Sequence, residues 1–159
     1  TTFHIHQALL CSASPFFSRA LNGRFREGTT KTVNLLDDDP RIVAAFVAWL
    51  YTGQVFGMFG MFGCGGPAWI DLCQLWIFGD RIAARRLQNE AMQLFLNSIR
   101  DKNGDAARFD FSNERHAQAI DEIYENTAPD SPLREAIVDA FMRQKGSKDL
   151  PSNMWLPKE

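Results

Sequence analysis

Residues 3–17 read FHIHQALLCSASPFF, and this stretch does most to decide the fold. Phe3 and Ile5 alternate with two histidines, which is the period of a half-buried strand. The apolar residues that follow recur at helical spacing and predict a short helix. Ser14 is then a good N-cap and Pro15 a good first helical residue, so we expect a second helix to begin there.

Residues 39–53 read DPRIVAAFVAWLYTG and indicate a longer helix. Asp39 is expected to cap it, Pro40 to take its first position and Gly53 to end it. Two more aspartates just before the cap suit the positive end of the helix dipole. The apolar side chains form one wide helical face. That face comprises Ile42, Val43, Phe46, Val47, Leu50 and Tyr51.

The remaining segments add one strand and several helices. Residues 31–36 are expected to form a strand and the glycine-rich residues 56–67 a loop. Helices are predicted over 69–78, 80–100 and 113–125 and from 132 onward, with Asp80 and Ser131 as N-caps. The expected inner faces of the last two helices are Ala117, Ile120, Ile123 and Tyr124, and Leu133, Ile137, Val138 and Phe141. Two strands among six or seven helices predict an α+β fold, mostly helical, with a small sheet.

Length and composition favour one globular domain with a tail. The chain has 159 residues, of which 45% are hydrophobic, and a formal net charge of −2. It therefore has no basic field for nucleic acid or an anionic membrane. It shows no signal peptide and no apolar run of membrane-spanning length, which favours cytoplasm or nucleus.

The order of these pieces resembles the BTB/POZ family, especially its fungal members. The resemblance extends from the His-x2-Leu-Leu and Ser-Pro-Phe-Phe helices through the Trp-Leu-Tyr-Thr-Gly end at 49–53 to the segment LWIFGDRI at 75–82. It implies a BTB-like domain over 1–102, a helical extension over 103–144 and a tail over 145–159. The strand that normally precedes the segment matching 3–6 is missing here, which puts dimerisation in doubt and leaves a sheet edge open.

The resemblance points to Phe25, Arg26 and Glu27 as partner-binding residues. Family members that serve as adaptors of cullin-type ubiquitin ligases carry a hydrophobic-x-Glu motif at this place. An exposed Phe25 would anchor in a partner pocket, and Glu27 would orient the contact. The alternative is that Phe25 covers the core and Glu27 is only solvated. Among the glycines, Met58, Phe59, Met61 and Phe62 form either an adaptable partner surface or a loop core.

Other candidate sites are explained better by structure than by chemistry. Residues 37–39 suit helix capping better than metal binding, because calcium-loop spacing is absent. His4 and His6 have no third zinc ligand at a recognisable spacing. The cysteines at 11 and 73 lie in apolar helical contexts, without a histidine base that the sequence indicates. Three arginines, Arg81, Arg85 and Arg86, are expected on one solvated helical flank.

We therefore expect a protein–protein interaction module that does no chemistry and needs no cofactor or metal. Its best concrete version is a self-associating adaptor that recruits substrates to a cullin-type ubiquitin ligase. The alternative is an oligomerisation scaffold without cullin binding, for example in transcription. An enzyme is disfavoured because no convergent set of histidine, cysteine and carboxylate residues is present.

Overall fold

The protein was examined as a computed structural model, which describes residues 1–55, 69–100 and 114–145. These residues form α-helices joined by short connections, and no strand is assigned among them. The helices are α1 (Gln7–Ala13), α2 (Pro15–Asn22), α3 (Arg26–Thr30), α4 (Pro40–Thr52), α6 (Trp69–Arg81), α7 (Arg85–Arg100), α8 (Glu114–Glu125) and α9 (Pro132–Lys145). Within these ranges, no helix is long and apolar enough to span a lipid bilayer.

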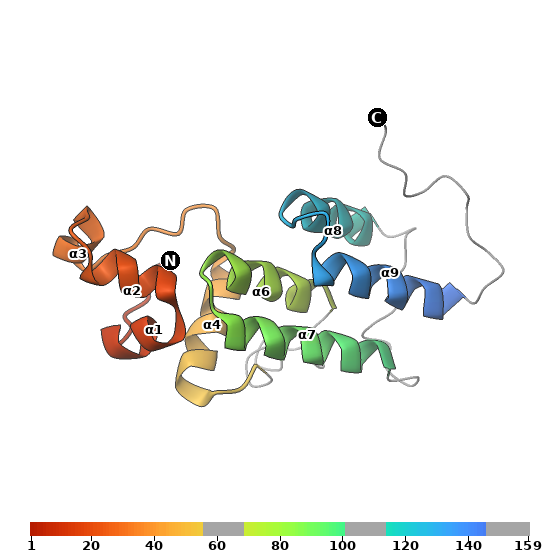
Figure 1. Ribbon diagram of the computed structural model, residues 1–159, viewed down its shortest axis with the longest axis horizontal. Coiled ribbons are helices and arrows are strands. Elements are labelled where there is room, and N and C mark those ends of the chain that lie inside the picture. Colours follow the sequence, from red (N-terminus) through yellow and green to blue (C-terminus); the bar gives the residue numbers. More distant parts are fainter. Residues whose placement is uncertain (56–68, 101–113, 146–159) are drawn as a thin grey trace.

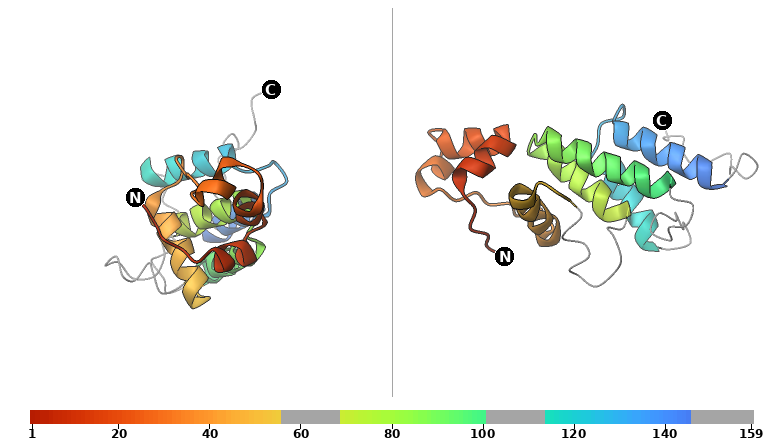
Figure 2. Two further views of the ribbon diagram at one scale, coloured as in Figure 1. Left: turned by 90° about the vertical axis from the view of Figure 1, so that its left-hand side faces the viewer. Right: turned by 90° about the horizontal axis from the view of Figure 1, so that it is seen from below.

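The molecule is elongated, and its helices follow one another along the long axis. Helices α1, α2 and α3 form one end, and α8 and α9 form the other (Figure 1). Between them, α6 and α7 run antiparallel as a hairpin, with α4 beside them (Figure 2). Helix α8 packs on α6 and helix α9 packs on α7. The partner-binding candidates at 25–27 therefore lie at the end far from α9.

Aromatic side chains join the N-terminal helices to the central hairpin. The Phe46 ring on α4 lies 6.0 Å from the Phe17 ring and 5.4 Å from the Phe78 ring. It also stacks at 6.1 Å on Trp49, one turn further along α4. Phe46 is only 1% exposed, so α2, α4 and α6 meet at a fully buried centre. Aromatic pairs at such distances add to the stability gained by burial.

Three of the four predicted helix starts are confirmed by their hydrogen bonds. Ser14 Oγ accepts from the Phe17 amide at 3.2 Å, with Pro15 in the first position of α2. Asp39 Oδ1 accepts from the Arg41 amide at 2.8 Å at the start of α4. Ser131 Oγ accepts from the Leu133 amide at 3.3 Å. Each cap satisfies an amide that the helix leaves unpaired, which is why the local sequence sufficed to place it.

The two predicted strands are wrong: residues 3–6 and 31–36 are not strands in the structure. The alternation behind the prediction is present, because Phe3, Ile5, Val33 and Leu35 are half-buried against the core. A strand also needs a neighbour to complete its backbone hydrogen bonds. Alternating apolar residues therefore show which side chains face inward, but they do not by themselves form the backbone hydrogen bonds of a sheet. The predicted small sheet is not confirmed.

Some predicted boundaries and inner faces are also wrong. Asp80 does not cap a new helix, because α6 continues through it to Arg81. A left-handed Ala83 (φ 54°) follows the end of α6, and the Asp80 side chain accepts from Gln88 instead. On the inner faces, Tyr51, Ala117 and Val138 are exposed, whereas Trp49, Ala119 and Ala140 are buried. The spacing of apolar residues predicted approximately which side of each helix is buried. Packing against the neighbouring helices determined which residues lie at the middle of that side.

A candidate protein-interaction surface at the α2–α3 turn

The exposed Phe25 lies at the turn between α2 and α3. Its side chain is 69% exposed, the second highest value among the large hydrophobic residues of the described ranges. It occupies the N-cap position of α3 in extended conformation (φ −77°, ψ 169°). The alternative that Phe25 covers the core therefore does not hold. An exposed aromatic side chain at a turn can anchor in a partner pocket.

Two glycines allow this turn to be tight. A Cβ added to Gly28 would clash with the backbone oxygen of Gly23. A Cβ added to Gly23 would in turn lie 2.5 Å from the backbone oxygen of Arg19. Both positions therefore need glycine: Gly28 lets the start of α3 approach the end of α2, and Gly23 lets the chain leave α2 close to its last turn. This close approach holds the intervening Phe25 at the surface.

Hydrogen bonds fix the same turn from the other side. The Lys31 ammonium donates to the Leu21 backbone oxygen at 2.7 Å, which satisfies a carbonyl at the end of α2. Lys31 itself is left-handed (φ 54°), and its amide donates to the Glu27 oxygen at 2.8 Å. Between α1 and α2, the Gln7 side chain donates to that of Asn22 at 3.0 Å. Helix α3 buries no side chain of its own. The turn therefore depends on these polar contacts rather than on apolar burial.

Arg26 and Glu27 occupy the first turn of α3 rather than a loop. Arg26 is exposed and Glu27 is half-buried. A glutamate in the first turn also suits the positive end of a helix. The structure therefore brings the three residues predicted from the sequence together on one short, supported segment. Met58, Phe59, Met61 and Phe62 lie outside the described residues.

The histidines and Cys73 have ordinary structural surroundings in the described ranges. No group of three or more histidine, cysteine, aspartate or glutamate side chains comes together within residues 1–55, 69–100 and 114–145. His6 Nδ1 lies 2.7 Å from the Tyr51 hydroxyl, and the His116 ring packs edge-on against Trp69. Cys73 is fully buried, and burial raises the pKa of its thiol, which makes it a poor nucleophile.

The aspartates before α4 have separate structural roles. Asp39 caps the helix, and its hydrogen bond with the Arg41 side chain holds its pKa below the usual value. Asp38 also pairs with Arg81 at the end of α6, and its side chain is only 7% exposed. The arginines predicted on one helical flank are divided, since Arg81 ends α6 while Arg85 begins α7. Arg86 lies over the Trp49 ring at 5.8 Å.

Sequence reasoning missed the long-range contacts of two side chains, Ser14 and Glu90, which join distant helices. The buried Ser14 hydroxyl donates to the Ile82 backbone oxygen at 2.5 Å, in addition to its capping role. Glu90 on α7 accepts from the Trp49 indole at 2.8 Å and from the Val55 amide at 2.9 Å. These contacts span 68 and 35 or more residues, so no local pattern could have indicated them.

Comparison with protein families supports the resemblance found in the sequence. The model of the BTB/POZ domain matches residues 1–58. Residues 1–58 match the BTB/POZ family. No solved structure matches the chain.

The BTB/POZ match covers α1 to α4 and includes the whole α2–α3 turn. BTB/POZ domains mediate protein–protein interactions, so the match implies a protein-interaction module. The helices α6 to α9 lie beyond the matched residues. The fold packs them on the BTB/POZ region through α4 and α6.

Proposed function

We propose that the chain is an adaptor whose α2–α3 turn binds a cullin-type ubiquitin-ligase scaffold. The observation that carries the proposal is the exposed Phe25 beside Glu27, within the BTB/POZ match. In this role the domain performs no chemistry and needs no cofactor. It holds the scaffold at this turn while another surface holds the substrate.

The support of the turn suits a binding role. Binding costs less when the contacting side chain is already held in place. Phe25 is held outward by the two close glycine approaches and by the Lys31 hydrogen bond to α2. Because Phe25 is mostly solvated, the core gains little from it. A phenylalanine so exposed and so well supported fits an anchor for a partner pocket.

The test is a binding measurement with the N-terminal domain of a BTB-binding cullin. Gel filtration with light scattering would show a complex, and titration calorimetry would give its affinity. We expect Phe25→Ala and Glu27→Lys each to weaken binding about tenfold or more, as is common at hot spots. Thr29→Ala is the matched control, because Thr29 is exposed on the same helix. Equal affinity for all four proteins, or no complex with the well-folded parent, would overturn the proposal.

A further inference from the structure

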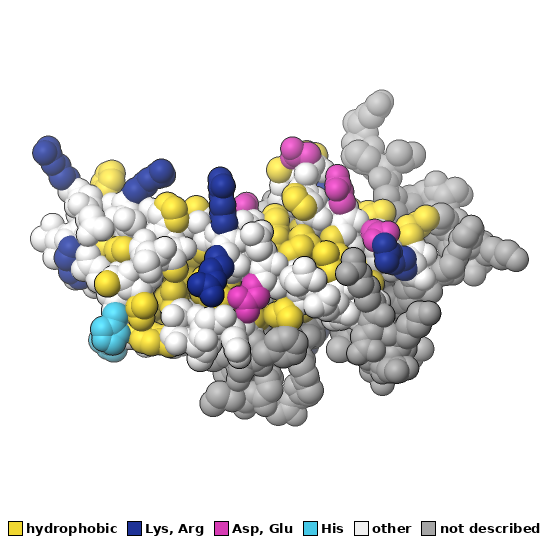
Figure 3. All heavy atoms as spheres, turned by 60° about the horizontal axis from the view of Figure 1, so that its bottom comes forward, with side chains coloured by type: hydrophobic (Ala, Val, Ile, Leu, Met, Phe, Trp, Pro, Cys, Tyr) yellow, Lys and Arg dark blue, Asp and Glu magenta, His cyan; other side chains and the backbone are white. Residues whose placement is uncertain are grey.

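The two ends of the molecule carry opposite charge. Residues 1–36 contain four lysines and arginines against one acidic residue, a net charge of +3. Residues 114–145 contain seven acidic residues against four basic ones, a net charge of −3. Figure 3 shows Lys and Arg side chains at the α1–α3 end and Asp and Glu side chains gathered toward the α8–α9 end. The nearly neutral net charge of the chain therefore hides a strong asymmetry along its long axis.

The basic end exposes both cationic and aromatic side chains. Arg19, Arg24 and Arg26 are exposed, and none forms an ion pair within the part of the chain that the structure describes. Phe25 lies between two of them in sequence, and Phe16 on α2 is 40% exposed. We call these five residues the Phe25 surface. It offers apolar area together with unpaired positive charge.

At the acidic end, α9 presents a face that no other described helix covers. Glu135, Val138, Asp139 and Met142 are all exposed and follow the i, i+3, i+4, i+7 spacing of one helical face. Val138 is 44% and Met142 41% exposed, although the opposite side of α9 is already buried against the body. We call these four residues the α9 stripe. It is apolar and acidic, as the Phe25 surface is apolar and basic.

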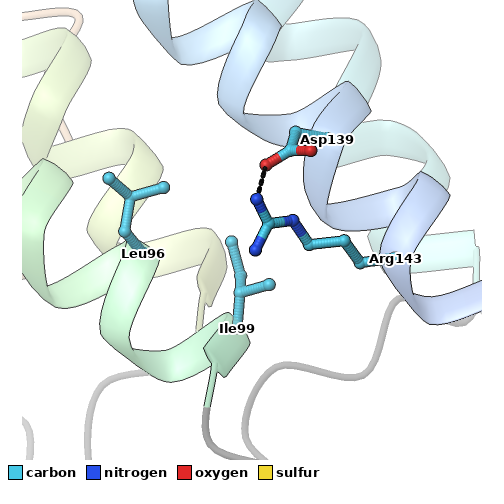
Figure 4. A pocket seen from close by; sticks show the side chains of 4 residues that line it. All are labelled: Leu96, Ile99, Asp139 and Arg143. Carbon is cyan, nitrogen blue, oxygen red and sulfur yellow. Dashed lines mark ion pairs between the residues drawn. The ribbon is translucent and has the colours of Figure 1, made fainter.

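The ion pair that Arg143 forms with Asp139 of the α9 stripe does not prevent Asp139 from binding another cation. Asp139 pairs with Arg143 at 2.9 Å, and both side chains are more than half exposed. Figure 4 shows this pair along α9, beside a hollow whose other wall is formed by Leu96 and Ile99 of α7. An exposed pair of this kind contributes little to stability, so Asp139 can exchange it for another cation at small cost.

From this complementarity we propose that the Phe25 surface of one copy binds the α9 stripe of a second copy. The two surfaces match in character, with apolar side chains flanked by opposite charges, which favours association and fixes its orientation. They lie at opposite ends of an elongated molecule, so the contact is head-to-tail. A heterologous contact of this kind leaves one free surface at each end and therefore builds chains of copies, which stay open unless the rotation between copies closes them into a ring larger than a dimer. The inference is independent of the proposed cullin role, although the two partners would compete for Phe25.

Sedimentation velocity of the whole chain over a range of concentrations tests this inference. We expect a mass that rises with concentration without a plateau at the dimer, and that falls when salt is raised from about 50 to 500 mM. We expect Glu135→Lys/Asp139→Lys to weaken association about tenfold or more, and Arg24→Glu/Arg26→Glu to do the same. An equimolar mixture of these two variants should associate again, because each restores the charge that the other lacks.

Two controls show whether a loss of association comes from the position of the substitutions, from the change in net charge or from unfolding. Asp121→Lys/Glu125→Lys changes the net charge equally at an exposed i, i+4 pair on α8, off the stripe, and should associate much more strongly than the stripe variant. Circular dichroism must show unchanged helix content in every variant. A monomer at all concentrations, a closed dimer indifferent to the variants, or a mixture that fails to associate would overturn the inference. Cullin binding by Glu135→Lys/Asp139→Lys is expected to be unchanged, so this result tests the cullin proposal separately.

Discussion

The α2–α3 turn and the α6–α7 hairpin are stabilised in different ways. Helix α6 buries eight of its thirteen residues, and the hairpin it forms with α7 is the most extensively packed pair of helices in the described ranges. Helix α3 buries none of its five. The hairpin depends on apolar burial, whereas the turn depends on close glycine contacts and on side-chain hydrogen bonds to the backbone.

This difference explains how the molecule exposes an aromatic residue without losing its fold. Hydrophobic burial in the hairpin and at Phe46 supplies most of the driving force for folding. The turn then needs only local contacts to keep its shape, so Phe25 is left to solvent. The first three predictions below test this division of roles, and the fourth tests the cap that begins α4 between the two regions.

The largest expected effect is on the hairpin core. Leu75 is fully buried on α6, and Leu75→Ala should lower the free energy of unfolding by about 2–5 kcal/mol, through lost burial and the cavity left behind. Phe25→Ala removes more atoms but should change stability by only about 0.5 kcal/mol, because the ring is exposed. Urea denaturation followed by circular dichroism compares the two. Equal losses for both variants would contradict the comparison.

The hydroxyl of Ser14 is a polar link between the N-terminal helices and the hairpin. Ser14→Ala removes the cap of α2 and leaves the buried Ile82 oxygen without this donor. We expect a loss of about 2 kcal/mol in the free energy of unfolding, from the cap and the unpaired acceptor together. Ser12→Ala is the control, since Ser12 is exposed and bonds only within α1. A change at Ser14 no larger than at Ser12 would argue that the link carries no energy.

The turn itself is tested by Gly28→Ala. The added methyl group would clash with the Gly23 oxygen, so α3 must move away from α2. We expect a local loss of about 1–3 kcal/mol, seen as faster amide exchange in residues 23–31, with the exchange of α6 and α7 unchanged. Thr29→Ala, on the exposed side of α3, serves as the matched control. Faster exchange at the hairpin as well would show that the two regions are not independent.

The smallest effect is electrostatic and concerns the cap of α4. The pKa of Asp39 is lowered in the folded state by the Arg41 hydrogen bond, so its carboxylate stabilises the fold above the unfolded pKa near 3.8. That contribution is lost as the pH falls through the lower folded pKa. Since Asp39 is partly solvated, we expect only about 0.5 kcal/mol. Asn also caps helices well, so Asp39→Asn should isolate the charge. Denaturation between pH 7 and 2.5 should show the difference between the two proteins vanish in acid.

The site was predictable from sequence only in part. The choice of Phe25, Arg26 and Glu27 as candidates followed from the family resemblance. The exposure of Phe25 did not follow, because the same residues also fit a side chain covering the core. The structure decided this point, since α3 is set against the end of α2 and leaves the Phe25 ring outside.

The sequence by itself determined most of the helices and the caps at Ser14, Asp39 and Ser131, because these depend on residues within four positions of one another. It also determined which side chains alternate inward at 3–5 and 33–35. Only the tertiary structure decided that these segments form no ladder, that Trp49 rather than Tyr51 is buried, and that Ser14 and Glu90 join distant elements. The opposite charges of its two ends are written in the sequence, but only the linear arrangement of the helices places them far apart. Such features depend on which elements become neighbours, and that choice is made by packing over the whole chain.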